Sequence, residues 1–175
     1  MKKIIAFLLT ALMATSMVAC GSKQTVDTSL DDVINKGEIT VAISPDFAPN
    51  EFKDPNTGEI MGSDIYVAQY VADYLSKKYD TEINLKIEEM DLKTCQAAVQ
   101  AGSVDFSLNG YSATDDRKEN FYITGFYGKT EASDASYQGF LINEKDLDKF
   151  TTAESFDGAK IAVQLSSLQD NLISA

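Results

Sequence analysis

The chain has 175 residues, of which 44% are hydrophobic and 24% charged, so it is long enough and apolar enough to bury a globular core. It carries 27 Asp and Glu against 15 Lys and Arg, and the net charge of −12 argues against binding to nucleic acid or to anionic lipid head groups. Histidine is absent, which removes the commonest general base and the commonest transition-metal ligand, and we expect neither a metal nor a cofactor.

The first twenty residues are typical of a secretory signal peptide. A basic start at Lys2 and Lys3 precedes an apolar run at 4–18, which is too short for a stable membrane span. The closing letters M-V-A-C-G-S resemble a lipobox, in which Cys20 is lipidated, carries palmitate and becomes the mature N-terminus. The alternative is plain secretory cleavage, which leaves Cys20 as a free thiol. We expect a leader at 1–20 and a polar tether at 21–29 that holds an extracytoplasmic protein to the cell membrane, at the cell surface or in the periplasm.

Apolar periodicity predicts alternating strands and helices between residues 30 and 132. In chain order these are a helix at 30–36, a strand at 39–43, a loop at 46–55, a hairpin turn at 54–58, a helix at 64–78 capped by Ser63 or Asp64, a strand at 82–90, a helix at about 91–101 capped by Asp91 and a strand at 104–108. Strands that alternate with helices of this length form βαβ units. We therefore expect one lobe with a mainly parallel sheet and helices on both faces.

Cys95 falls on the predicted helix at 91–101, on its inward face. We interpret it as a small buried apolar residue, and the alternative is a reactive thiol. With Cys20 lipidated, no second cysteine is available for a disulfide bond.

The segment 103–121 is the strongest candidate for a ligand-binding segment. After the strand at 104–108, Ser112 and Thr114 are suited to N-cap a helix whose first turn is acidic. Arg117 lies in that turn and is the only arginine of the chain, and a guanidinium grips a carboxylate with two parallel hydrogen bonds. The alternative is that Arg117 pairs with the acids at 115, 116 or 119 on a solvated face. Spacing alone leaves both open.

Phe47 follows the first strand of the predicted sheet. Loops that follow parallel strands lie at the carboxyl edge of the sheet, where open α/β folds bind ligands, so Phe47 is a candidate wall of a binding site. The alternative for Phe47, and for Phe52, is packing beneath their own loop.

Several motifs together resemble one family. S-L-N-G-Y-S-A-T-D-D-R at 107–117 resembles the S-G-x-S-x-T-x-x-R signature of family 3 of the extracellular solute-binding proteins, which serve amino-acid ABC importers. Further matches are I-T-V-A-I-S-P-D-F-A-P-N-E-F-K-D at 39–54, G-E-I-M-G-S-D-I at 58–65 and A-A-V-Q-A-G-S-V-D-F at 97–106. The resemblance runs in order from about residue 39 to 173.

The resemblance implies an α/β fold of the periplasmic-binding-protein-like (type II) class, with one complete, mainly parallel lobe at 30–132 and an incomplete second lobe at 133–175. It implies a hinge strand at 136–143, a short helix at 145–156, a strand at 160–164 and a helix at 166–174 whose N-terminus points at the cleft. Because members of the family continue further, we expect a truncated gene product or a fragment.

The resemblance also implies a role for each residue of the site. Arg117 binds the ligand carboxylate, Ser112 donates its hydroxyl or its backbone N–H, and Thr114 adds a hydroxyl or supports the loop. Asn50 stands where the family has an aromatic residue, which makes the pocket more polar or more open, and Leu168 replaces a second hydroxyl residue. The remaining implied positions are Asn109 and Gly110, whose backbone groups face the ligand, Ser44, Phe47 and Asn50 around the ligand side chain, and Ser166 and Ser167 from the second lobe.

The expected function follows from the same resemblance. We expect a monomeric binding protein, not an enzyme, that captures a polar amino acid outside the membrane and delivers it to an ABC permease. One alternative is a dehydratase-like enzyme on this fold, for which Asp46 is the loop acid near the cleft. Another is the sensing ectodomain of a receptor kinase. Because the cleft has one complete lobe, we expect the chain by itself to bind weakly or not at all.

Overall fold

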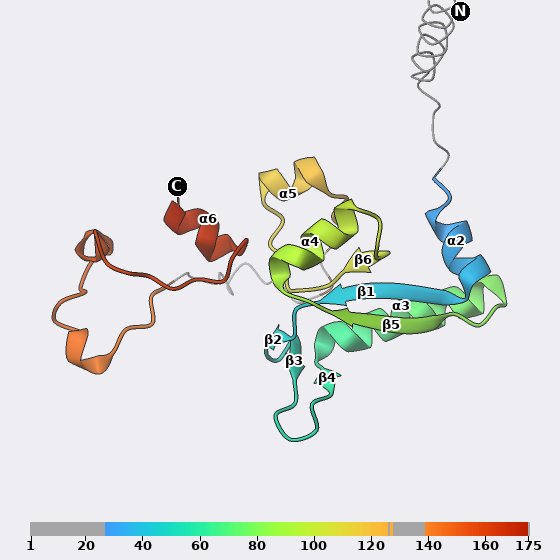
Figure 1. Ribbon diagram of the computed structural model, residues 1–175, viewed down its shortest axis with the longest axis horizontal. Coiled ribbons are helices and arrows are strands. Elements are labelled where there is room, and N and C mark those ends of the chain that lie inside the picture. Colours follow the sequence, from blue (N-terminus) through green and yellow to red (C-terminus); the bar gives the residue numbers. More distant parts are fainter. Residues whose placement is uncertain (1–26, 126, 128–138, 175) are drawn as a thin grey trace, which may run out of the picture. The chain divides into compact units, whose positions relative to one another are not determined.

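The computed structural model describes residues 27–125, 127 and 139–174 (Figure 1). The expected leader with Cys20, most of the expected tether and residues 136–138 of the expected hinge strand lie outside the described residues. The chain divides into two units, residues 1–32 and residues 33–175. In the first unit, Asp27 accepts a hydrogen bond from the backbone N–H of Ser29, where helix α2 (Ser29–Lys36) begins.

The second unit is organised around a three-stranded parallel sheet in the order β5-β1-β6 (Figure 1). The central strand β1 (Glu38–Ile43) pairs with β5 (Asn84–Glu89) along its whole length and with β6 (Phe106–Ser107) at its second half. Because neighbours flank it on both edges, β1 is buried from residue 39 onward. The three predicted strands and their parallel arrangement are confirmed, with β6 shorter than expected.

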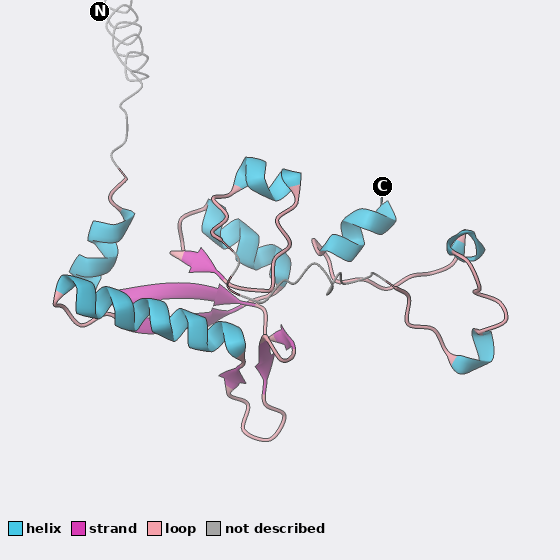
Figure 2. Cartoon of the chain, turned by 180° about the vertical axis from the view of Figure 1, so that it is seen from behind, coloured by secondary structure: helices cyan, strands magenta, loops and turns pink. Residues whose placement is uncertain are grey.

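Two helices cover the two faces of this sheet (Figure 2). Val41 and Ile43 of β1 pack against Ala68 of α3 (Ser63–Tyr79). Ala42, which lies between them in sequence, packs against Cys95 of α4 (Leu92–Gln100). Since successive strand side chains point to opposite faces, these contacts place one helix on each face, as predicted.

Cys95 is fully buried in the α4 side of the core, which confirms its interpretation as a small apolar residue. Burial raises the pKa of its thiol to about 11. The reactive thiolate is therefore scarce at neutral pH.

The start of α3 corrects the predicted cap. The N-cap residue is Gly62, with φ of +131°, and it makes no side-chain cap bond. The backbone N–H groups of Ser63 and Asp64 instead donate to the carbonyl oxygens of Pro49 and Asn50, at 3.2 and 2.9 Å. Because a neighbouring loop already satisfies the helix donors, no side-chain cap is needed there, and the Asp64 side chain is buried.

A small antiparallel sheet stands where a loop was expected at 46–55. It consists of β2 (Asp46–Phe47), β3 (Glu51–Lys53) and β4 (Ile60–Met61), paired in that order. Strands of two or three residues are too short to show alternation in sequence. The predicted turn at 54–58 is confirmed, since the carbonyl oxygen of Asp54 accepts from the N–H of Gly58 at 2.8 Å.

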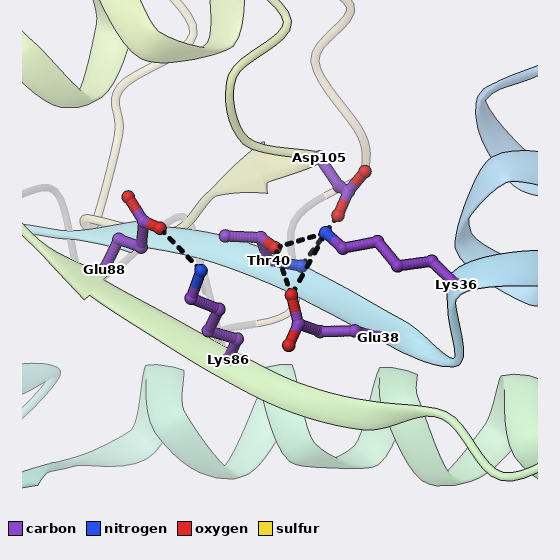
Figure 3. A network of polar contacts seen from close by, with 6 residues as sticks. All are labelled: Lys36, Glu38, Thr40, Lys86, Glu88 and Asp105. Atoms are coloured by element: carbon purple, nitrogen blue, oxygen red, sulfur yellow. Dashed lines mark hydrogen bonds and ion pairs between the residues drawn. The ribbon is translucent and has the colours of Figure 1, made fainter.

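A polar network lies along β1 and its neighbours. Figure 3 shows its members, Lys36, Glu38, Thr40, Lys86, Glu88 and Asp105. The Lys36–Glu38 and Lys86–Glu88 ion pairs are partly exposed, and solvent screening makes the contribution of such pairs to stability small. The Asp105 carboxylate accepts the buried backbone N–H of Thr40 at 2.7 Å, which ties β1 to the residue that precedes β6.

The segment 139–174 contains two 3-10 helices, η2 (Glu144–Asp146) and η3 (Ala153–Phe156), and the helix α6 (Leu168–Ser174). The helix expected at 166–174 is confirmed from residue 168, and the one expected at 145–156 is two single turns. The strand expected at 160–164 and the part of the hinge strand at 139–143 are wrong, because neither run pairs with a strand among the residues that the structure describes. A strand forms only where a partner satisfies its backbone groups.

Across the described residues, no helix combines the length and the apolar character required to span a membrane.

Candidate functional site

The carboxyl ends of β1 and β6 are joined by Asn109. Its side-chain oxygen accepts a hydrogen bond from the backbone N–H of Ser44, and its amide nitrogen donates to Ser107 Oγ at 2.6 Å and to the carbonyl oxygen of Ala42 at 3.3 Å. Asn109 and Ser44 are both buried. The Asn109 side chain therefore fixes the start of the binding loop, which we define as residues 109–114, against the end of β1.

The binding loop turns at Gly110, which lies next to Phe47 and Asn50, two of the residues expected around a ligand side chain. Its φ is +53°, and a Cβ atom built on it would lie 3.2 Å from the Phe47 ring and 3.6 Å from Asn50 Nδ2. The Phe47 side chain is 54% exposed, so it does not pack beneath its own loop. The structure thus brings Phe47, Asn50 and Gly110 together at the carboxyl edge of the sheet.

The binding loop ends in helix α5 (Asp115–Asn120), which carries Arg117. Thr114 is its N-cap residue, and the Thr114 hydroxyl accepts the backbone N–H of Arg117 at 3.4 Å. The predicted helix and its cap are confirmed. The roles expected of the Thr114 hydroxyl at the ligand site stay predictions.

The Arg117 side chain is buried, with 6% of its surface exposed. Its guanidinium donates to the carbonyl oxygens of Ser112 and Ser166, both at 3.0 Å. The guanidinium carbon lies 5.1 Å from the centre of the Tyr111 ring, within the range of a cation–π interaction. Burial lowers the pKa of Arg117 from its ordinary value, but an arginine side chain keeps its charge at neutral pH.

Arg117 forms no ion pair with any carboxylate of the described residues. The neighbouring Asp115 pairs with Lys118 instead, at 3.0 Å. The alternative in which Arg117 pairs with its acidic neighbours on a solvated face is therefore wrong. A buried cation that is not paired is costly, and the guanidinium has five N–H donors, more than the two carbonyl bonds use.

Ser166 and Ser167 precede α6 and face Arg117 differently from what was expected. The carbonyl oxygen of Ser166 accepts from Arg117 and from Gln96, at 3.0 and 3.4 Å. The backbone N–H of Ser166 donates to the Asp170 carboxylate at 2.9 Å, and Ser167 Oγ accepts the N–H of Asp170 at 3.1 Å. Ser166 therefore presents an acceptor to the guanidinium, while Ser167 caps the helix.

Three residues of the site were not predicted. Tyr111 lies between Gly110 and Ser112, and its hydroxyl bonds with Ser107 and Asn109, each at 3.1 Å. Glu51 and Asp64 are buried acids, and Asp64 accepts the N–H of Gly110 at 3.4 Å. A sequence signal existed for Asp64, because residues 64, 68 and 72 share the buried face of α3.

Asp46, the acid considered for an enzyme, lies on the exposed strand β2. Its carboxylate accepts a hydrogen bond from Gln164 at 2.8 Å.

A parallel sheet whose loops gather a buried arginine, an aromatic wall and a glycine turn at its carboxyl edge defines a ligand-binding α/β lobe. Residues 39–139 match the model of the bacterial extracellular solute-binding proteins, family 3, and the chain belongs to that family. The resemblance and the type II fold class inferred from sequence are confirmed. The family is one of extracellular binding proteins.

The chain is similar to the arginine-binding extracellular protein ArtP of Bacillus subtilis, with 27% identity over 172 residues, which is 97% of this chain and 58% of the relative. It is 26% identical over 175 residues to a probable histidine-binding protein of Campylobacter jejuni, which is 100% of this chain and 62% of the relative. An amino acid ABC transporter substrate-binding protein from Streptococcus pneumoniae bound to L-arginine matches with a TM-score of 0.64 and 30% identity, covering 83% of this chain and 57% of that one. The chain thus spans about three fifths of the length of these relatives.

Proposed function

We propose that this chain belongs to the substrate-binding component of an ABC importer, which captures a polar amino acid outside the membrane and delivers it to the permease. The observation that carries the proposal is the buried guanidinium of Arg117 at the carboxyl edge, which forms no ion pair with a carboxylate of the described residues. The ligand's own carboxylate would supply that charge. Relatives that bind arginine and histidine support an amino acid as the ligand.

Each site residue has a role in this proposal. Arg117 binds the ligand carboxylate together with Ser112, and Thr114 holds the loop in place. Phe47, Asn50 and the Gly110 turn flank the rest of the ligand. Ser44 and Asn109 fix the loop to the sheet, and Ser166 and Ser167 approach from the segment after the lobe. The net charge of −12 favours a ligand with a cationic side chain.

The test is a titration of the chain followed by NMR chemical shifts, with L-arginine, L-histidine, L-lysine and L-glutamine as ligands. Of the two outcomes expected from the sequence, weak binding or none, the buried guanidinium favours weak binding. We therefore expect saturable shifts at the binding loop for at least one of the four amino acids, with a dissociation constant of about 1 mM, which corresponds to about two charge-assisted hydrogen bonds. For L-arginine the matched control is agmatine, which lacks only the carboxylate. Equal binding of L-arginine and agmatine, or no saturable shift with any of the four, would contradict the proposal.

We also propose that a lipid on Cys20 anchors the protein to the outer face of the cell membrane. The lipobox-like letters at 17–22 support it. Labelled palmitate fed to the producing bacterium should enter the wild-type protein and remain with the membrane fraction. The Cys20→Ala variant should carry no label, and a labelled Cys20→Ala protein would rule out this attachment site.

A further inference from the structure

Two acidic side chains are buried next to each other below the binding loop. Glu51 on β3 and Asp64 on α3 are each 1% exposed. The carbonyl oxygen of Asn50 accepts the N–H of Asp64 at 2.9 Å, which brings the adjacent Glu51 to the start of the helix that carries Asp64, and the Asp64 charge acts on the Glu51 carboxyl group. Two buried carboxylates in contact repel each other strongly when both are ionised, so one of them keeps a proton.

The hydrogen-bond donors around the pair place that proton on Glu51. Asp64 Oδ2 accepts from the hydroxyl of Tyr127 at 2.9 Å and from the N–H of Gly110 at 3.4 Å. Glu51 Oε2 has no partner among the described residues. Because donors stabilise a carboxylate and Glu51 Oε2 has none, the proton of the pair lies on Glu51, whose carboxyl group can donate it toward Asp64.

The residues that surround the Asp64 carboxylate come from different parts of the fold. Glu51 belongs to the small sheet that carries Phe47, Gly110 is the turn of the binding loop, and Tyr127 lies in the segment after α5. Asp64 itself belongs to the first turn of α3, where the helix dipole favours a negative charge. The carboxyl pair therefore connects the wall of the proposed site to its loop.

We propose that Glu51 keeps a proton beside Asp64 and that this carboxyl pair positions the Gly110 turn against Phe47 and Asn50, so that loss of the Glu51 proton at alkaline pH disorders the amino-acid site. The inference rests on the proposed function for its effect on the ligand. Glu51 and Asp64 are positioning residues, which act through Gly110.

The direction of the pH dependence follows from the groups that face Glu51. Burial raises the pKa of Glu51 from 4.5 to about 9, and the charges of Asp64 and Asp46 add to the rise. Burial and the Asp64 charge also raise the pKa of Tyr127, which remains a donor. The unfolded chain loses the Glu51 proton near pH 4.5, whereas the folded chain keeps it to about pH 9. The stabilisation linked to this proton is therefore complete below about pH 4.5 and is lost progressively as the pH rises to about 9.

The experiment compares the wild-type chain with Glu51→Gln, which keeps the size of the side chain and a donor to Asp64 but cannot ionise. Affinity for the amino acid that binds best in the titration above, and thermal unfolding, are measured from about pH 6 to about pH 10. The readout is the ratio of the wild-type affinity to the affinity of the variant. The ligand's amino group also titrates in this pH range, but it affects both proteins equally and cancels in the ratio. We expect the wild-type affinity to fall about tenfold more per pH unit above about pH 9 than that of the variant. We also expect the melting temperature of the variant to depend less on pH. If affinity and melting temperature depend on pH in the same way in the wild type and in Glu51→Gln, the proposal is overturned.

A second measurement needs no ligand. The NMR signal of the Gly110 amide should shift with a midpoint near pH 9 in the wild type and should not shift there in Glu51→Gln. In Asp64→Asn the midpoint should move to lower pH, because the neighbouring charge is gone. If the chemical shift of the Gly110 amide does not change with pH in the wild type, the proposed carboxyl pair is refuted, even if Glu51→Gln does not fold. A wild type that shows the Gly110 midpoint but binds no amino acid supports the pair and refutes the proposed function instead.

Discussion

Replacement of Arg117 by alanine is expected to weaken amino-acid binding by at least about a hundredfold, and replacement by lysine by at least about tenfold. The guanidinium is buried at the carboxyl edge of the sheet and carries donors beyond those used by the carbonyl oxygens of Ser112 and Ser166. Each charge-assisted bond to a carboxylate contributes about 1.5–3 kcal/mol. Lysine restores the charge but not the planar fork that makes two such bonds at once.

The matched control is Lys118→Ala, which removes the next cation of the same helix. Lys118 is exposed and pairs with Asp115, so its loss should change the affinity by less than about twofold. Affinities are compared by NMR titration. Because Arg117 also binds two carbonyl oxygens, the melting temperature of each variant is measured alongside. Folded Arg117→Ala protein that binds as tightly as the wild type would remove the basis of the proposed function.

Replacement of Gly62 by alanine is expected to reduce the free energy of unfolding by about 3 kcal/mol or more. A Cβ atom at Gly62 would overlap the carbonyl group of Asn50 and lie 2.8 Å from the carbonyl oxygen of Pro49. Both contacts are with backbone atoms, which cannot swing aside as a side chain does. The φ of +131° adds strain for any residue with a Cβ atom. A loss of this size is a large part of the total stability of an ordinary domain.

The matched control for this substitution is Gly58→Ala. Gly58 also has a positive φ, of +75°, but no atom lies within 4 Å of the position its Cβ would take. Only the backbone strain remains, and the expected loss is about 1 kcal/mol. Urea denaturation of the two variants measures the difference, which is the contribution of the close contact together with the greater backbone strain at Gly62. Equal losses would mean that the loop at 49–50 does not press on the start of α3.

Much of the lobe was accessible from the sequence because its signals are local. The alternation of apolar residues at 39–43 and 82–90 predicted β1 and β5, and Thr114 predicted the start of α5. The spacing of the residues from Ser107 to Arg117 identified the family and the loop that carries the arginine. The wrong predictions depended on distant partners. The run at 160–164 has the composition of a strand, but within the described part of the chain no strand pairs with it.

By itself, the sequence determined the order of the elements, the burial of Cys95 and the family, because periodicity, capping and motif spacing depend on residues close together along the chain. Only the tertiary structure decided that Arg117 is buried without an acidic partner among the described residues, that the loop at 49–50 satisfies the first donors of α3, and that Glu51 meets Asp64 below the binding loop. These features depend on which distant backbone and side-chain groups meet when the chain folds. No local sequence pattern specifies these contacts, since the sequence around an acidic residue on a helix can be the same whether its carboxyl group faces water or another carboxyl group.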